Sequence, residues 1–265
     1  MLQTGDPFPE PPQWPSDIHD DFTAPTLRTD LWVDHYLPHW TTPERSRARY
    51  GVTDAGLELR IDVDQLDWRP EDAPLRVSNL QTGLFSGPVG SSRGTHRHRA
   101  DGLLVRTETP EISLWAPAAG RVDLRVSASI DAGCMLAAWL VGSEAESEED
   151  AGEICLFEID GSAIGSHTRV RTGVKAHGDP RLQTEMSEVS VPIDASKPHS
   201  WSALWDQDGV LIGCEGVVVF SSAQVLEYQL FLMVDLFEIE PRSQPSAYPK
   251  TALVHSVRGW TSARS

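Results

Sequence analysis

The sequence has 265 residues, with 39 acidic and 22 basic side chains and a formal net charge of −17. A chain this acidic repels phosphate backbones, so its composition excludes nucleic-acid binding driven by counterion release. Its three cysteines are too few for a disulfide framework and lack the spacing of a zinc site. No apolar run is long enough to span a bilayer, so we expect no membrane partner. The nine tryptophans are the unusual feature that remains.

The start of the chain predicts an extended arm. Five prolines lie within residues 1–16, and proline fixes φ and removes a backbone donor. We therefore expect an arm at residues 1–20 and a single domain at residues 21–265. The N-terminus lacks the basic start and apolar centre of a signal peptide. This predicts a cytoplasmic protein for the sequence as it stands, and a secreted one if its start has been trimmed.

From residue 21 onward the pattern is that of β-structure. Residues 57–63 and 120–126 alternate apolar and polar side chains, which predicts strands with one solvent-facing side. Residues 134–141 form a short continuous apolar run, which predicts a strand buried on both faces. Further strands are predicted at residues 153–160, 209–214, 229–239 and 253–259. Helical periodicity is not sustained anywhere, so the sequence predicts an all-β fold.

Two charged segments are interpreted as surface loops. The acidic run at residues 144–150 is typical of a solvated loop, with a calcium site as the alternative. The run rich in arginine and histidine at residues 93–99 is also interpreted as a surface loop, and the alternative is a place along a substrate cleft. We expect no cofactor and no catalytic metal, and leave a structural calcium ion as an open alternative.

Two glutamates interrupt the otherwise apolar strand predicted at residues 153–160. A buried carboxylate is costly unless it is paired or used, so Glu153 and Glu158 either point to solvent or take part in chemistry. In a regular strand, residues five apart face opposite sides, but a β-bulge near Leu156 and Phe157 returns both to one face. Two carboxylates on one face suit a retaining glycosidase, which needs them ~5–5.5 Å apart.

This strand resembles the bulged E-x-D-x-x-E active-site strand of glycoside hydrolase family 16, the laminarinase and lichenase group. Further blocks resemble family motifs in the same order, namely residues 120–125, 137–142, 173–180, 199–216 and 254–258. The resemblance spans residues 21–260. It implies two antiparallel sheets packed as a curved, concanavalin A-like jelly-roll sandwich, with a sugar cleft on the concave face.

The resemblance also implies roles for individual residues. Glu153 would be the nucleophile and Glu158 the general acid/base, while Trp139 would lie beneath the sugar next to the scissile bond. Aromatic faces stack on the C–H faces of sugars, which gives a use to the excess of tryptophan. Weaker candidates for substrate contacts are Trp115, Asn79 and His177.

The chain departs from the family pattern at Cys155, which stands between the two glutamates in place of an aspartate. That aspartate hydrogen-bonds the nucleophile in the family, whereas a thiol is a weak donor and brings no charge when neutral. A histidine expected near Lys175 is also absent.

Two hypotheses of different kinds follow. The first is an endo-β-1,3- or β-1,3-1,4-glucanase that retains anomeric configuration, and a transglycosylase would use the same residues. The second is a carbohydrate-binding jelly roll with weak or no turnover. The expected partner is an oligo- or polysaccharide in each case, and the oligomeric state stays open.

Overall fold

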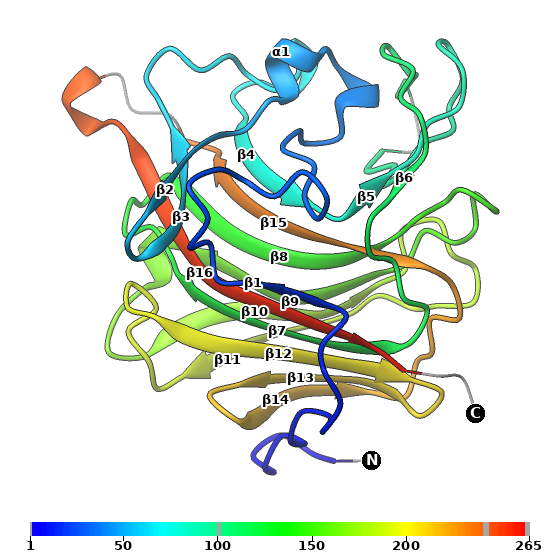
Figure 1. Cartoon of the computed structure of the whole chain (residues 1–265), viewed down its shortest axis with the longest axis vertical. Helices are drawn as coiled ribbons and strands as arrows, with labels where there is room; N and C mark the ends of the chain where they lie inside the picture. Colours follow the sequence, from blue (N-terminus) through cyan, green and yellow to red (C-terminus); the bar gives the residue numbers. More distant parts are fainter. Residues whose placement is uncertain (1, 100–101, 241–243, 263–265) are drawn as a thin grey trace.

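The computed structural model describes residues 2–99, 102–240 and 244–262. Two large antiparallel sheets of curved strands form the domain (Figure 1). One sheet consists, in spatial order, of β14 (Val217–Ser222), β13 (Gly209–Cys214), β12 (His199–Asp206), β7 (Gly120–Ser127), β16 (Lys250–Thr261), β3 (Gly56–Ile61) and β2 (Arg49–Thr53), with β1 (Ile18–Asp20) paired to β16.

The second sheet carries the predicted active-site strand. Its order is β11 (Glu185–Val191), β10 (Thr168–Lys175), β9 (Glu153–Asp160), β8 (Cys134–Gly142), β15 (Leu230–Glu238) and β4 (Arg76–Gln81). A small sheet of β5 (Gly83–Leu84) and β6 (Ile112–Ser113) lies apart from both. The arrangement is that of a jelly-roll sandwich, as the sequence predicts.

Helices contribute little to this architecture. The only α-helix in the described part of the chain is the single turn α1 (Pro43–Ser46). Across the same residues, no helix combines the length and the apolar character needed to cross a membrane. Each predicted strand is confirmed to within a few residues. Val63 departs from the alternating pattern, which predicts a buried side chain. It lies beyond the end of β3 and is 48% exposed.

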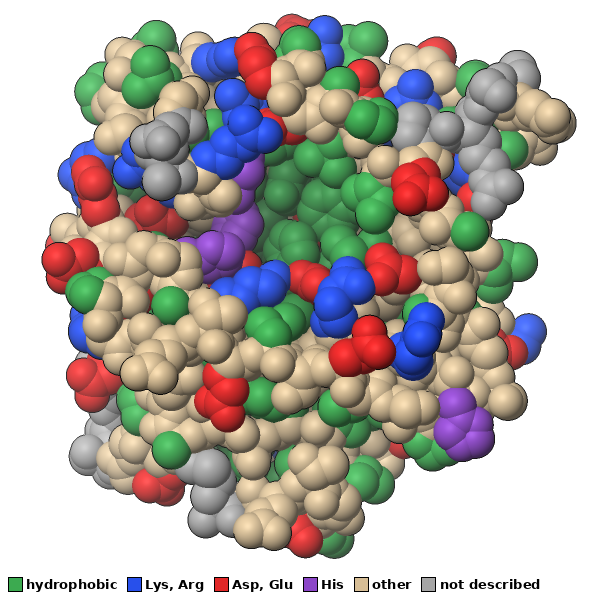
Figure 2. All heavy atoms as spheres, turned by 180° about the vertical axis from the view of Figure 1, so that it is seen from behind, with side chains coloured by type: hydrophobic (Ala, Val, Ile, Leu, Met, Phe, Trp, Pro, Cys, Tyr) green, Lys and Arg blue, Asp and Glu red, His purple; other side chains and the backbone are tan. Residues whose placement is uncertain are grey.

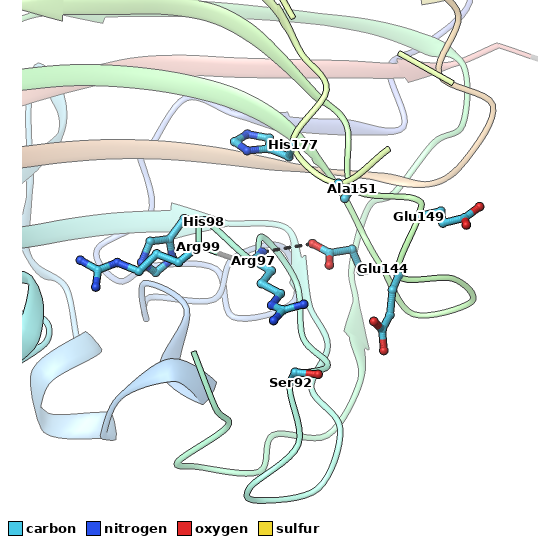
Figure 3. Close-up of a pocket in the computed structure, with 10 residues that line it drawn as sticks. Ser92, Arg97, His98, Arg99, Glu144, Glu149, Ala151 and His177 are labelled. Atoms are coloured by element: carbon cyan, nitrogen blue, oxygen red, sulfur yellow. Dashed lines mark hydrogen bonds between the residues drawn. The ribbon is translucent and has the colours of Figure 1, made fainter. Parts of the chain in front are cut away.

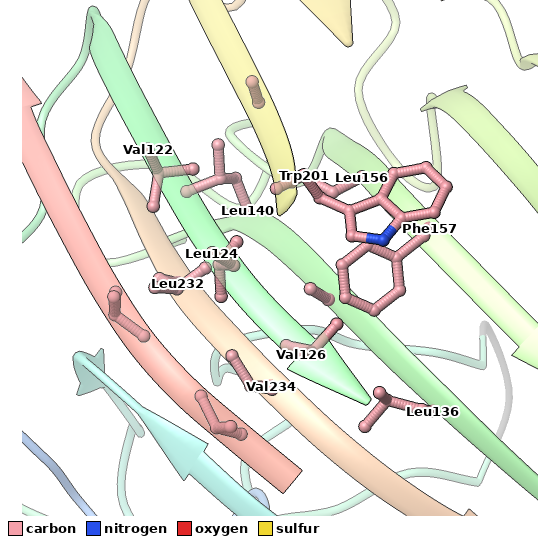
Figure 4. Packing of buried hydrophobic residues seen from close by; sticks show 14 of the residues in the cluster. Val122, Leu124, Val126, Leu136, Leu140, Leu156, Phe157, Trp201, Leu232 and Val234 are labelled. Carbon is pink, nitrogen blue, oxygen red and sulfur yellow. The ribbon is translucent and has the colours of Figure 1, made fainter. Parts of the chain in front are cut away.

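The main hydrophobic core lies between the two sheets. Alternate residues of each strand point inward, because successive side chains in a strand face opposite sides. Figure 4 shows this packing, in which Trp201 of β12 meets Phe157 of β9 with ring centroids 5.1 Å apart. Apolar residues from both sheets surround the pair, among them Val122, Leu124, Val126, Leu136, Leu140, Leu232 and Val234.

A second apolar cluster covers the other face of the six-stranded sheet. It includes Trp139 from β8, Met233 from β15 and Cys155 from β9, together with Trp40 and Trp68 from the segments that precede β4. The central strands are therefore buried on both faces, which confirms the prediction for residues 134–141. The side chains of Glu153 and Glu158 also lie on this second face.

The proline-rich start of the chain packs along the edge of the eight-stranded sheet. The amide of Gly5 donates to the carbonyl of Val218, and the amide of Phe8 donates to that of Gly216. These bonds give the arm an ordered path beside β14 in place of the β-strand partner that this edge otherwise lacks. The division of the chain at residue 20 stays a prediction.

Candidate active site

Strand β9 contains the β-bulge that the spacing of its glutamates predicts. Ala138 of β8 lies opposite Phe157, but the next residue, Trp139, lies opposite Cys155. Leu156 is therefore the extra residue, and it points into the core between the sheets together with its neighbour Phe157. Two consecutive residues on one face are what a bulge produces, and every residue after them changes sides.

The bulge places three polar side chains together on the second face of the sheet. Atoms of Glu153, Cys155 and Glu158 lie within 4.8 Å of one another. Lys175 of β10 joins the two carboxylates, because its Nζ lies 2.9 Å from Glu153 Oε1 and donates a hydrogen bond of 2.6 Å to Glu158 Oε1. The two glutamates thus share one cation and are close enough to act on a single bond.

A glycine in β10 allows this strand to follow the bulged one. Gly173 lies opposite Cys155 and has a φ of +148°, a conformation that L side chains rarely adopt. A Cβ atom at this position would lie 2.2 Å from the carbonyl oxygen of Glu185. Only glycine fits without a shift of the backbone, and the register it sets places Lys175 opposite Glu153.

Glu153 is held as an anion in a buried position. Its side chain is 1% exposed, and His177 Nε2 donates to its Oε2 at 2.8 Å. Burial alone would raise the pKa of Glu153, but the His177 hydrogen bond and the charge of Lys175 outweigh it and lower the pKa to about 2. The carboxylate is therefore ionised at neutral pH, as a nucleophile must be.

Glu158 is more accessible and has two cationic partners. Lys175 occupies one of its oxygens, and Arg171 Nε donates to the other, Oε2, at 2.9 Å. Arg171 also binds Asp160 through Nη1 at 2.5 Å, so it is fixed from two sides. Because both oxygens of Glu158 are engaged, one cation has to release its oxygen before Glu158 can hold a transferable proton there.

Cys155 lies between these charges without sharing them. The side chain is completely buried, and burial raises the pKa of its thiol well above the usual value. The thiol is therefore neutral and supplies neither charge nor a strong hydrogen bond to the glutamates. Its Sγ makes a long contact of 3.8 Å with the carbonyl of Arg171 and also interacts with the side chain of Trp139.

Trp139 lies on the same face, one strand away from the glutamates. Lys175 Nζ is 5.2 Å from the centre of its ring, and Phe237 packs against it at 5.5 Å. The ring of His96 lies nearly parallel to the indole, at 21° and with centroids 5.8 Å apart. His96 therefore covers part of the Trp139 ring face on which a sugar could stack.

The segment at residues 93–99 packs against the candidate site, with Thr95 and His96 buried, so its interpretation as a surface loop is wrong. A place along a substrate cleft stays a prediction. The Thr95 hydroxyl donates to the Ser143 carbonyl at 2.9 Å and accepts from the amide of Phe85. Those bonds fix the neighbouring His96, which is 7% exposed and has a positive φ of 55°. The positive φ of His96 cannot be predicted from the sequence, whereas the histidines in this segment could have indicated a functional role.

A cavity of about 470 Å³ is lined in part by His177, the residue that contacts Glu153. Figure 3 shows that its lining comes from separate parts of the chain, with Arg97 and His98 on one segment, Glu144 and Glu149 on another, and His177 on a third. Glu144 corrects the prediction of a fully solvated acidic loop, because it is 4% exposed and accepts from the amide of Arg97. Burial raises the pKa of Glu144 to about 8.

The space-filling view shows how the site opens to the surface. A hollow with a hydrophobic floor has histidine side chains on one wall and a row of cationic and acidic side chains along its rim (Figure 2). An apolar floor with polar groups at its border suits a sugar ring, which has apolar C–H faces and hydroxyls at its edge.

Two predicted substrate contacts are corrected by their positions. Trp115 is 5% exposed in the core between the sheets, where its ring lies edge-on to Trp205 at 6.2 Å. Asn79 lies on β4 with no exposed surface, and its Nδ2 donates to Asp235 Oδ1 at 2.7 Å. Neither side chain can reach a sugar in this structure. The third weaker candidate, His177, does lie in the site, in contact with Glu153.

No family model and no curated protein matches the sequence, whereas several solved structures resemble the fold. The structure is similar to that of the GlcNAcα1-4Gal-releasing endo-β-galactosidase from Clostridium perfringens, with a TM-score of 0.79 and 23% identity over 96% of this chain. The chain spans 65% of the length of that protein.

Other similar structures are β-glucanases. One is SCLam, a non-specific endo-β-1,3(4)-glucanase from family GH16, with a TM-score of 0.66 and 14% identity over 98% of this chain and all of that one. Another is the laminarinase catalytic domain from Thermotoga maritima MSB8, with a TM-score of 0.64 and 13% identity over 95% and 99% of the two chains. These likenesses, together with the two packed sheets, show that this chain has a jelly-roll fold similar to those of SCLam and the laminarinase.

Proposed function

We propose that the protein is a retaining glycoside hydrolase that cleaves β-glucans of the β-1,3 or mixed β-1,3/1,4 type. The observation that carries the proposal is the pair Glu153 and Glu158, whose carboxylate oxygens lie within 4.8 Å on one face of a sheet. A retaining enzyme needs two carboxyl groups about 5–5.5 Å apart, whereas an inverting enzyme needs a wider gap that leaves room for water.

The surroundings of Glu153 fit the role of nucleophile, because its carboxylate is buried and ionised. In the first step the ionised Glu153 attacks the anomeric carbon, the glycosidic C–O bond breaks, and Glu158 gives its proton to the departing oxygen. In the second step Glu158 takes a proton from water, the water oxygen attacks the anomeric carbon, and Glu153 leaves as a carboxylate. Atoms and protons balance over the two steps, and no cofactor enters.

Lys175 couples the two steps through its contacts with both carboxylates. While Glu153 is an anion, Lys175 can pair with it and leave Glu158 free to carry a proton. Once Glu153 has become a neutral ester, the same cation pairs with Glu158, which must then be ionised to act as a base. Lys175 thus provides by a different chemical route the tuning that a central aspartate would give at Cys155.

The main alternative is a carbohydrate-binding protein without turnover. It is favoured by the neutral thiol of Cys155 and by the two cations that engage Glu158. A pure binding protein, however, has no need of an ionised carboxylate that is 1% exposed beneath the sugar site. The buried charge of Glu153 is costly, so its presence favours the enzyme.

A second candidate substrate is a glycan with β-linked galactose. The structural likeness to the C. perfringens endo-β-galactosidase, at a TM-score of 0.79, exceeds the likeness to SCLam, at 0.66. The two sugars differ in the orientation of one hydroxyl, so the same pair of glutamates serves either. The assays below therefore include both substrate classes.

The test compares wild type with Glu153→Gln and Glu158→Gln on laminarin, lichenan and a β-galactoside polymer. We expect the wild type to release reducing ends with retained anomeric configuration, seen by NMR, and each variant to lose at least about 100-fold in rate. Glu58→Gln is the matched control, because Glu58 pairs with Arg60 on β3 of the other sheet. Binding of all three polymers without release of reducing ends would contradict the enzyme proposal, as would inversion.

A further inference from the structure

Two histidines of the site approach the same carboxylate oxygen of Glu153. His177 Nε2 lies 2.8 Å from Glu153 Oε2, and His96 Nδ1 lies 3.8 Å from that same oxygen. The three ligand atoms lie within 4.8 Å of one another, and the two imidazole rings meet edge to face at 5.1 Å. We propose that His96, His177 and Glu153 form a binding site for a divalent transition metal ion such as Zn²⁺, and that the ion blocks the nucleophile.

The donor set and its spacing fit zinc. Zinc sites with an open position commonly have two imidazoles and one carboxylate, with bonds of about 2.0–2.2 Å, which places neighbouring donor atoms about 3.3 Å apart. The two measured distances to Glu153 Oε2, 2.8 and 3.8 Å, lie on either side of that value. Small rotations of the two histidines are enough to build the site, and water or chloride completes a tetrahedron.

The protonation states also fit, because a metal binds neutral imidazole and ionised carboxylate. Burial lowers the pKa of His96 to about 3, so its ring is neutral at physiological pH. Lys175 engages Glu153 through Oε1 and leaves Oε2 to the histidines. The three carboxylates of Glu153, Glu158 and Asp160 outnumber the two cations that pair with them, Lys175 and Arg171, and this formal charge of −1 favours a cation.

An ion can reach the site through the cavity described above. His177 lines that cavity and is the most exposed of the three, with 24% of its side chain accessible, whereas Glu153 is 1% exposed (Figure 3). The exposed carboxylates of Glu148 and Glu149 also line the cavity, beside the guanidinium groups of Arg97 and Arg99. The route therefore leads through a cavity with charges of both signs to His177 and then to Glu153.

The bound ion has a direct consequence for the chemistry. Glu153 has one oxygen paired with Lys175, so a metal on the other oxygen withdraws electron density from the carboxylate and occupies the space in which an anomeric carbon would have to lie. Zinc and substrate then exclude each other at this carboxylate. This consequence rests on the proposed hydrolase function, whereas metal binding itself does not.

The test titrates the full chain, stripped with a chelator, with ZnCl₂ by calorimetry and with Co²⁺ by visible absorption. We expect one ion per chain and the intense visible bands of tetrahedral Co²⁺. His96→Gln and His177→Gln should each raise the dissociation constant at least ~10-fold. His199→Gln is the matched control, because His199 also pairs with one glutamate, at 3.1 Å, but among the described residues it belongs to no cluster of three possible metal ligands.

Three results would overturn the proposal. They are the absence of saturable binding at one site, equal affinity in wild type and in both active-site variants, and an equal loss of affinity in His199→Gln. Each would show that His96 and His177 form a hydrogen-bond network only. Should Zn²⁺ bind as expected while no glycan is hydrolysed, the metal site stands and the proposed function fails, so the two outcomes are distinguishable. Thermal unfolding of each variant checks that the fold is intact.

Discussion

Replacing Lys175 by methionine tests the idea that one cation serves both glutamates. Lys175 is 24% exposed and lies 2.9 Å from a Glu153 oxygen that is itself buried. At an effective dielectric constant of ~20, two charges ~4 Å apart interact by about 4 kcal/mol, and one pKa unit is about 1.4 kcal/mol. Loss of Lys175 could therefore raise the pKa of Glu153 by up to ~3 units, which we reduce to ~1–2 because water reaches the lysine.

The assay is the pH dependence of kcat/KM on the best substrate. Since Glu153 must be ionised, its pKa of about 2 sets the acid limb, and this limb should move up by ~1–2 pH units in Lys175→Met. The plateau should fall about 100-fold, because Glu158 loses the Lys175 hydrogen bond that holds one of its oxygens in place. Lys175→Arg should restore the position of the acid limb, and Lys197→Met, at an exposed site, should behave as wild type. An acid limb that is unchanged in Lys175→Met would refute the reasoning.

The remaining predictions concern stability and binding. Gly173→Ala should lower the free energy of unfolding by about 1–3 kcal/mol from its positive φ alone, measured by urea denaturation. Phe157→Ala should lower the free energy of unfolding by about 3–5 kcal/mol in the same measurement, because it leaves a cavity in the core between the sheets. Trp139→Phe should weaken glycan affinity about 3–10-fold by titration calorimetry, from the loss of stacking area. The ionised Glu153 should stabilise the fold above its unfolded pKa of ~4.3 and stop doing so as pH falls through about 2, so Glu153→Gln should flatten stability between those values. An equal slope in both proteins would contradict this.

The sequence predicted the parts of this structure that depend on local alternation. The strand at residues 153–160 and its bulge follow from two glutamates at an odd spacing within an apolar run, since side chains alternate along any strand. Burial of residues 134–141 on both faces follows from a continuous apolar pattern. In these cases the neighbours along the chain carry the information.

The sequence could not predict what depends on distant packing. His96 reaches the site because the Thr95 hydroxyl binds Ser143, which comes from a different loop. For Trp115 the sequence leaves both a cleft contact and a place in the core open, because residue type does not tell which side of a sheet a side chain faces. The role of Lys175 depends on the pairing of residues 153–160 with the next strand, which places this cation opposite Glu153.

The bulge in β9 also limits how this protein can evolve. The meeting of Glu153 and Glu158 depends on how many residues separate them, whereas Cys155 shows that the identity of a residue between them can change. Deleting Leu156 would remove the bulge and leave the glutamates four residues apart, an even spacing that keeps both on one face of a regular strand. The spacing of the glutamates and the bulge must therefore change together, because an odd spacing needs the bulge and an even spacing does not. In any relative with this sheet, the number of residues between the two glutamates indicates whether the strand is bulged.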